Sequence, residues 1–140
     1  MMEEIYEESL MIDEKHIYRF TKPSEDFCAK VDAALLKQAV RILSDNAAKY
    51  THEGDEIVFS LGRTDEGKIY LQVQDMGIGM AEADVEHMFE RFYRADEARA
   101  QQGTGLGLAI AKWIVDKHRG CFQILSRTDL GTRVRIILPR

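Results

Sequence analysis

The chain has 140 residues, 45% of them hydrophobic, and a formal net charge of -5. This length supports one globular domain with a real core and is short for two, while the scattered basic residues argue against a nucleic-acid-binding face. No apolar run reaches the roughly 18 residues of a membrane helix, and Cys28 and Cys121 predict neither a disulfide framework nor a zinc site, which favours a reduced, intracellular setting.

The first 31 residues carry a mixed pattern. Their acidic start is compatible with a helical or frayed lead-in, and residues 15–20 resemble a strand that ends before Pro23. Residues 33–50 then show the period of an amphipathic helix, with Asp32 as its N-cap. The apolar stripe of this predicted helix consists of Leu36, Ala39, Val40, Leu43 and Ala47.

One edge of the same helix carries Ile42, Asn46 and Lys49, at intervals of four and three residues. Asn46 and Lys49 can therefore address one ligand, although a solvated helix edge explains the same pattern. Residues 56–61 and 68–74 alternate in hydrophobicity around a turn at 64–67, which predicts an antiparallel hairpin with one buried face.

The second strand of this hairpin leads into Asp75-Met-Gly-Ile-Gly79. Asp75 places a carboxylate acceptor at a strand end with two glycines beyond it, and its simpler interpretation is an Asx turn. Residues 82–93 predict another amphipathic helix, followed by a polar stretch that suits either a lid over a ligand or a surface loop. Arg91 and Arg94 are candidates for neutralising phosphate charge, with surface solvation as the alternative.

Alternating glycines at 103, 105 and 107 precede a helical pattern that ends at Arg119-Gly120. Glycines followed by a helix N-terminus form a cradle for an anion, most often a phosphate. Trp113 on this helix is expected in the core. Residues 121–125 and 133–138 predict two more strands, so the fold class is α+β, with helices covering one side of a mostly antiparallel sheet.

The glycines match neither a P-loop nor a dinucleotide fingerprint, because the lysine of the first and the preceding strand of the second are missing. Four blocks in order do match a known pattern: S-D-N-A-A-K-Y-T at 44–51, D-M-G-I-G-M at 75–80, M-F-E-R-F-Y-R at 88–94 and G-T-G-L-G-L-A-I at 103–110. From about Asp32 to Pro139 the chain resembles the ATP-binding catalytic domain of bacterial sensor histidine kinases.

The resemblance implies a Bergerat-type two-layer α/β sandwich, with a mixed, mostly antiparallel sheet covered by about three helices, as in gyrase, heat-shock chaperone and MutL ATPases. It implies ATP and Mg²⁺ as cofactors. Asn46 would hold Mg²⁺, Lys49 would reach ribose or phosphate, and Tyr50 would pack on the adenine. Asp75 would accept the adenine amino hydrogen, while Gly77 and Gly79 would give the base close access to the backbone.

The other implied roles concern the phosphates and the pocket wall. Phe92 would anchor the lid with Phe89, Arg91 or Arg94 would contact the terminal phosphate, and Thr132 would reinforce the adenine pocket. Backbone N–H groups would bind the phosphate chain at Gly103, Thr104, Gly105, Leu106, Gly107 and Leu108. Asn46, Lys49 and Arg91 would be the catalytic residues.

Two departures from the family pattern limit the function. Ile42 stands four residues before Asn46, where sensor kinases commonly have an asparagine and the gyrase branch has a glutamate, and an isoleucine can neither ligate Mg²⁺ nor act as a base. None of His16, His52, His87 and His118 has the context of a phosphoacceptor histidine.

We therefore predict a single catalytic domain over residues 1–140, with a lead-in and first strand at 1–31 and a motif-bearing core at 32–139. It would transfer the γ-phosphate of ATP to a histidine on a dimerisation domain that this chain lacks, and would act indirectly on a response regulator. The isolated chain is expected to be monomeric and cytoplasmic, without nucleic-acid or membrane contact. A same-fold serine kinase of anti-sigma type and a transfer-inactive nucleotide-binding or partner-binding module remain open.

Overall fold

The computed structural model describes residues 2–13, 15–21, 31–49, 51–77, 79, 107–127 and 130–139. Helices alternate with strands in the order α1 (Met2–Ile12), β1 (Ile17–Thr21), α2 (Ala33–Lys49), β2 (Glu56–Arg63), β3 (Ile69–Asp75), α4 (Gly107–Lys117), β4 (Cys121–Arg127) and β5 (Gly131–Leu138). These elements confirm the predicted hairpin over 56–74, the helix after the glycines and the two C-terminal strands. The predicted helix over 82–93 lies outside the described residues.

The five strands form one sheet in the order β1-β2-β3-β5-β4. β1 runs parallel to β2, and the other neighbours are antiparallel, so the sheet is mixed and mostly antiparallel as expected. After β3 the chain returns to the sheet at its edge as β4, and β5 then takes the position between β3 and β4. This order places the C-terminal end of β3 beside the start of β5, and the candidate site lies there.

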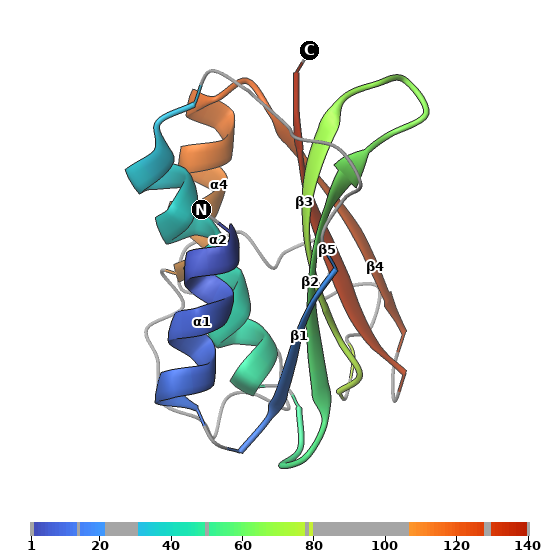
Figure 1. Cartoon of the computed structure of the whole chain (residues 1–140). Coiled ribbons are helices and arrows are strands. Elements are labelled where there is room, and N and C mark those ends of the chain that lie inside the picture. Colours follow the sequence, from blue (N-terminus) through green and yellow to red (C-terminus); the bar gives the residue numbers. More distant parts are fainter. Residues whose placement is uncertain are drawn as a thin grey trace.

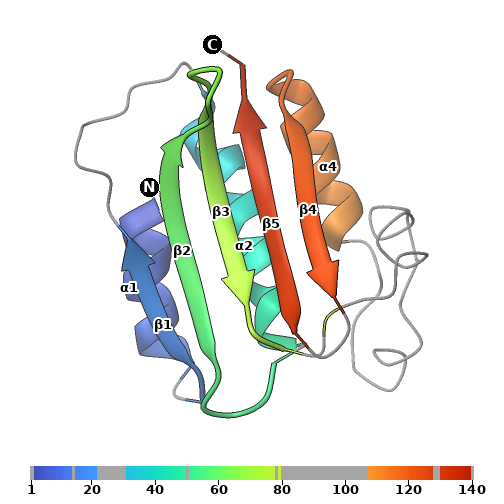
Figure 2. The same ribbon diagram turned by 90° about the vertical axis from the view of Figure 1, so that its right-hand side faces the viewer.

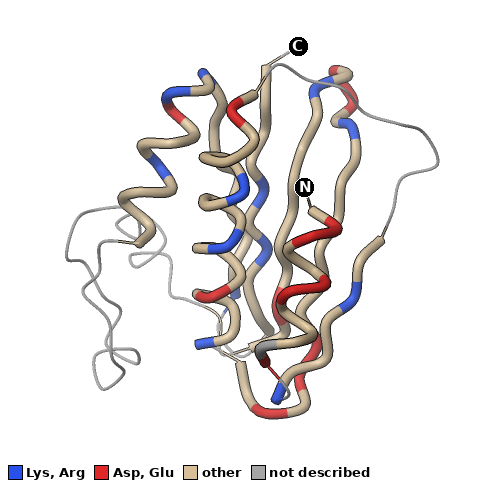
Figure 3. Tube along the Cα trace, turned by 60° about the vertical axis from the view of Figure 1, so that its left-hand side comes forward, with Lys and Arg blue, Asp and Glu red and all other residues tan. Residues whose placement is uncertain are grey.

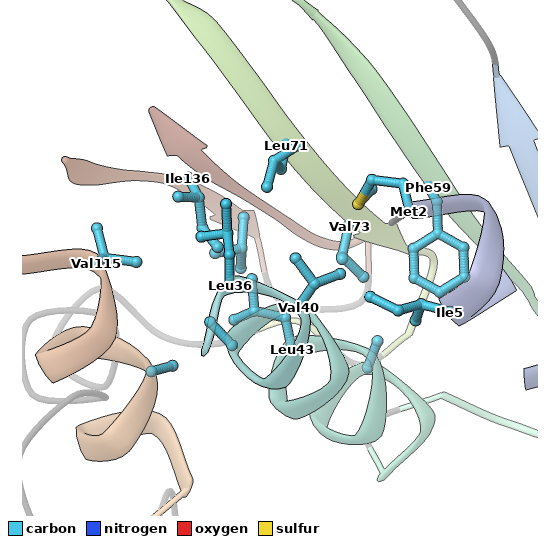
Figure 4. Packing of buried hydrophobic residues seen from close by; sticks show 14 of the residues in the cluster. Met2, Ile5, Leu36, Val40, Leu43, Phe59, Leu71, Val73, Val115 and Ile136 are labelled. Atoms are coloured by element: carbon cyan, nitrogen blue, oxygen red, sulfur yellow. The ribbon is translucent and has the colours of Figure 1, made fainter. Parts of the chain in front are cut away.

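All three described helices cover the same face of the sheet and leave the other face open (Figures 1 and 2). The core lies between these two layers, where side chains of α2 meet those of the central strands (Figure 4). The predicted apolar stripe of α2 is confirmed in full, because Leu36, Ala39, Val40, Leu43 and Ala47 are all buried. Asp32 caps this helix, with its Oδ1 accepting a hydrogen bond of 3.1 Å from the Leu35 N–H.

The acidic start of the chain forms a packed helix rather than a frayed lead-in. Met2 and Ile5 of α1 are 3% and 1% exposed and belong to the hydrophobic core (Figure 4). Glu4 and Glu8 face the basic side chains of α2, with Lys37 Nζ 2.8 Å from Glu4 Oε2 and 3.1 Å from Glu8 Oε1 (Figure 3). Buried apolar area thus holds α1 in place, and these partly exposed ion pairs add little to it.

Candidate nucleotide-binding site

Asp75 is the most buried acidic side chain in the described part of the chain. It ends β3, and 6% of its surface is exposed. Its Oδ1 accepts a hydrogen bond of 3.0 Å from the Gly77 N–H, which is the Asx turn of the simpler interpretation, and one of 3.3 Å from the Thr132 N–H across the sheet. Its Oδ2 has no hydrogen-bond partner among the described residues.

Burial raises the pKa of Asp75 from 3.8 to about 6, although the two backbone N–H groups oppose this shift. The carboxylate is therefore mostly ionised at neutral pH, in surroundings that solvate it poorly. A donor from a ligand would supply the hydrogen bond that water cannot, which is the usual reason for holding a buried acid at a recognition site.

Three strands contribute to one cross-strand row that contains Asp75. The register aligns Asp75 with Thr132 and Thr132 with Ser126, and the Thr132 and Ser126 hydroxyl oxygens are 2.7 Å apart. Antiparallel partners point to the same side of a sheet, so these polar groups share the helix-covered face with buried Ile57. Ser126 was not predicted as a site residue, since only the strand register connects it to Thr132.

Gly131 makes the close approach between β5 and the end of β3 possible. It has φ +116°, and a Cβ at this position would lie 2.2 Å from the Asp75 carbonyl oxygen. A side chain would therefore be strained by its backbone conformation and by a direct clash. Gly77 and Gly79 are also buried, and Gly79 has φ +68°, a backbone conformation that favours glycine.

Gly107, at the start of α4, lies close to Ile42 on the Asn46 edge of α2. Ile42 Cγ2 lies 3.4 Å from the position that a Cβ on Gly107 would take, and Gly107 is the first residue of α4. Asn46 is half-buried one turn beyond Ile42, and Lys49 is exposed at the end of α2. Ile42 therefore acts as an apolar spacer between two helices, and Asn46 follows it one turn later on the same edge of α2.

The N-terminus of α4 is where the sequence predicts an anion site. Its first turn contains no acidic residue, and Leu108 packs against the hydrophobic core. The free N–H groups of a helix's first turn carry partial positive charge. Other predicted site residues lie outside the described residues: Tyr50, Arg91, Phe92, Arg94, Gly103, Thr104, Gly105 and Leu106.

Asn46 is the one predicted metal ligand, and it lies half-buried on α2. The described residues contain no group of three His, Cys, Asp or Glu side chains that could hold a metal ion. Mg²⁺ at nucleotide sites commonly uses one or two protein oxygens together with phosphates and water, so a single amide oxygen suffices.

The structure corrects the expectation for Trp113 and shows a structural role for His118. Trp113 was expected in the core but is 56% exposed, with Lys117 Nζ 5.0 Å from its ring centroid, because Ala111, Ile114 and Val115 form the buried face of α4. His118 connects two helices: its Nδ1–H donates to the Ile114 carbonyl oxygen at 2.8 Å, and its Nε2 accepts from the Asp32 N–H at 2.9 Å.

Comparisons with known proteins identify the family and the fold. Residues 31–140 match the family model of histidine kinase-, DNA gyrase B- and HSP90-like ATPases. The chain belongs to this ATPase family. The chain is 38% identical to sensor histidine kinase WalK of Bacillus subtilis over 133 residues, and this alignment covers 92% of the chain and 22% of WalK. It is 48% identical over 103 residues to sensor protein CiaH of Streptococcus pneumoniae, covering 72% of this chain and 23% of CiaH.

The solved structure of the mycobacterial sensor histidine kinase MprB superposes with a TM-score of 0.83 and 32% identity, over 99% of this chain and 95% of that one. Within the ATPase family the chain is thus the ATP-binding catalytic domain of a sensor histidine kinase. It spans 21 to 24% of the length of the curated relatives that it matches. No helix in the described part of this histidine kinase domain is long and apolar enough to cross a bilayer.

Proposed function

We propose that this domain binds Mg-ATP between the end of β3, the Asn46 edge of α2 and the N-terminus of α4, and transfers the γ-phosphate to a histidine on a separate dimerisation domain. The observation that carries the proposal is the buried Asp75 carboxylate, with one oxygen held by Gly77 and Thr132 and the other available to a donor. The adenine amino group is such a donor.

Residues around Asp75 would make the adenine pocket selective. Gly131 lets the backbone of β5 approach the base-binding strand, and Gly77 and Gly79 provide a turn without side chains against the ring. Thr132 would reinforce the pocket through the hydroxyl that it pairs with Ser126. A guanine carries a carbonyl acceptor where adenine has its amino donor, so it would meet the carboxylate with the wrong polarity.

The phosphate end would be formed by α2 and α4. N–H groups at Gly107 and Leu108, with those of residues 103–106, would bind the phosphate chain, and Lys49 would supply a mobile positive charge. The Asn46 oxygen would hold Mg²⁺, which bridges phosphate oxygens and neutralises developing charge when bound. Arg91 or Arg94 would contact the terminal phosphate.

The proposed reaction needs no general base from this chain, because an acceptor imidazole is already a nucleophile. Catalysis would come from positioning and charge neutralisation. Ile42 agrees with a reaction that uses no base from this chain. It places apolar atoms beside Gly107, one turn before Asn46. Activation of water or of a serine hydroxyl would require a base at that position.

The chain would act as one part of a longer protein. We infer that residues 1–140 form a single catalytic domain, that a histidine-bearing dimerisation domain precedes it, and that a response regulator receives the phosphoryl group afterwards. This arrangement places the domain in the cytoplasm, where ATP and the regulator are available. The isolated chain would be monomeric, since the dimer would be formed by the other domain.

Calorimetry of ATP with and without Mg²⁺ tests the binding part of the proposal. Binding that strengthens when Mg²⁺ is added and is lost in Asp75→Asn is expected. Tight binding that ignores Mg²⁺ would instead favour a transfer-inactive nucleotide module, to which the Ile42 spacer also points. Absence of ATP binding by the folded domain would refute the site.

Radiolabelled ATP tests the transfer. The domain alone should remain unlabelled, and addition of the histidine domain of the full-length protein should give an acid-labile phosphohistidine on that partner. Acid-stable phosphoserine on a protein substrate would identify the serine-kinase alternative. No transfer to a folded histidine domain, despite normal ATP binding, would argue against the kinase assignment.

A further inference from the structure

The open face of the sheet presents a surface that the nucleotide site does not use. All described helices lie on the opposite face (Figures 1 and 2). The strand register defines rows across β3, β5 and β4 on this open face: Gln74, Arg133 and Leu125 form one row, and Gln72, Arg135 and Gln123 form the next. Arg127 extends this face beyond the first row.

Charge is segregated on this surface. Arg127, Arg133 and Arg135 are the charged side chains that the described residues of β3, β4 and β5 place on the open face, and all three are positive. The whole chain carries -5. By contrast, the acidic residues of α1 lie on the helix side of the molecule (Figure 3). Glu56 of β2 also lies on the open face, but it is paired with Arg19, whose Nε is 2.8 Å from its Oε1. A basic patch over β3, β5 and β4 of an acidic domain attracts partners of the opposite charge.

Arg135 already has partners within the sheet, whereas the other two arginines do not. The Arg135 guanidinium carbon is 4.1 Å from the Tyr70 ring centroid, and its Nε–H donates to Gln72 Oε1 at 2.6 Å. Within the described part of the chain, Arg127 and Arg133 have no ion-pair or hydrogen-bond partner for their side chains. Two guanidinium groups are therefore available at the end of the sheet near Asp75.

A hollow lies between these two arginines. Its lining includes Gln74 and Leu125 together with Arg127, Arg133 and Leu130. Leu125 is 54% exposed and Leu130 is 68% exposed, so apolar side chains flank the hollow in water. Thr128 and Asp129, between Arg127 and Leu130, lie outside the described residues. The hollow thus combines two guanidinium groups, a side-chain amide and exposed apolar surface.

We propose that this hollow docks an acidic segment of a partner protein, with carboxylates on Arg127 and Arg133 and an apolar side chain against Leu125 and Leu130. Planar guanidinium groups bind carboxylates with two parallel hydrogen bonds. A free phosphate would pair with the arginines but leave both leucines exposed to water. A flat anionic bilayer would not fill a hollow, so a protein segment uses all the features of the surface.

The docking surface is separated from the nucleotide site by one layer of backbone. Asp75 and Thr132 contribute to the floor of the hollow, but their side chains belong to the row on the helix-covered face. A docked segment and a bound nucleotide would therefore touch opposite sides of the same strands. The proposal does not depend on ATP transfer, and it can be tested with the nucleotide site filled.

Peptide display on the complete 140-residue chain with saturating Mg-ATP tests this surface. A random heptapeptide library should yield sequences with at least two acidic residues and a large apolar residue. Enriched peptides are then titrated against the parent, Arg127→Glu/Arg133→Glu and a neutral Arg127→Gln/Arg133→Gln variant. Lys15→Glu/Lys68→Glu is the matched control, because it changes the net charge equally at an exposed and a partly exposed lysine elsewhere. Circular dichroism and ATP titration confirm that each variant is folded.

We expect charge reversal to weaken peptide binding by about tenfold or more, neutralisation to weaken it less, and the lysine control to leave it unchanged. The proposal is overturned if no acidic sequence is enriched or if acidic peptides bind the arginine variants as well as the parent. It is also overturned if phosphatidylglycerol vesicles or inorganic phosphate bind the hollow as tightly as the peptides, since the surface would then recognise anions of another class. Concentration-dependent self-association that requires these arginines would assign the hollow to a second copy instead.

Discussion

Asp75→Asn should stabilise the unliganded domain while removing its affinity for ATP. Asparagine has nearly the same shape as aspartate, and its amide oxygen can still accept hydrogen bonds from the Gly77 and Thr132 N–H groups. The substitution therefore keeps the turn and the cross-strand contact. It removes the buried charge, and it places an NH₂ donor where the available carboxylate oxygen lay.

The size of the stability effect follows from the pKa. Burial raises the pKa of Asp75 from 3.8 to about 6, so the folded state binds a proton more tightly than the unfolded state. The free energy of unfolding therefore falls as pH rises through this window, by about 3 kcal/mol in total. Asp75→Asn lacks this loss. Its free energy of unfolding should therefore equal that of the parent near pH 4 and exceed it by up to about 3 kcal/mol at pH 8.

Binding should change in the opposite direction. Two donors would face each other in the complex of Asp75→Asn with ATP, and we expect a loss of affinity of about 100-fold or more. In the parent, adenosine affinity should rise between pH 5 and pH 7 as Asp75 ionises. Adenosine is the useful probe for this dependence, because it has no phosphate that titrates in the same range.

Urea unfolding at pH 5 and pH 8 and calorimetry with ATP and adenosine measure both effects. Asp65→Asn is the matched control, since Asp65 is exposed in the turn between β2 and β3 and should change neither quantity. The reasoning is refuted if Asp75→Asn is less stable than the parent at pH 8, which would mean that the carboxylate stabilises the fold. Unchanged ATP affinity in this variant would show that the adenine lies elsewhere.

Three further outcomes test the packing and the site. Gly131→Ala should lower the free energy of unfolding in urea by about 3 kcal/mol, because its Cβ meets the Asp75 carbonyl oxygen. Gly54→Ala is the control: Gly54 has φ +90° and nothing within 4 Å, so the loss should be only about 1 kcal/mol. Equal losses in the two variants would show that backbone strain alone matters. Asn46→Ala should bind ATP equally with and without Mg²⁺ in calorimetry, and a retained Mg²⁺ effect would exclude Asn46 as the ligand. His118→Ala should lower the free energy of unfolding by about 1 to 2 kcal/mol, because it loses the hydrogen bonds that connect α4 to the start of α2. Its ability to label an added histidine domain should not change, and loss of labelling with ATP binding intact would contradict a purely structural His118.

Local patterns predicted most elements of this domain well. The stripe on α2 follows the helical period, and its side chains are buried because a helix with one apolar face must cover another apolar surface. The alternation in β2 and β3 likewise predicted a hairpin with one buried face. Trp113 shows the limit of such patterns: an aromatic residue at helical spacing was expected inside, but the orientation of α4 against α2 leaves it 56% exposed.

The candidate site was predictable only in part for the same reason. Asp75 and its glycines form a continuous stretch of sequence, so their chemistry could be proposed from residue types alone. The cross-strand hydrogen bond from Thr132, the contribution of Ser126 and the contact of Ile42 with Gly107 depend on strand order and helix packing. Those contacts join residues far apart in the chain, and no periodicity specifies which distant element will be the neighbour.

The sequence by itself determined the elements, the apolar faces and the ordered motifs that resemble a histidine kinase catalytic domain, because these are encoded in residues close together in the chain. Tertiary structure decided that β5 lies between β3 and β4, which brings Thr132 to Asp75 and buries the carboxylate that we propose binds adenine. The same strand order aligns Arg133 with Leu125 on the open face. Both surfaces arise from pairing between distant strands, which is settled by the packing of the whole core.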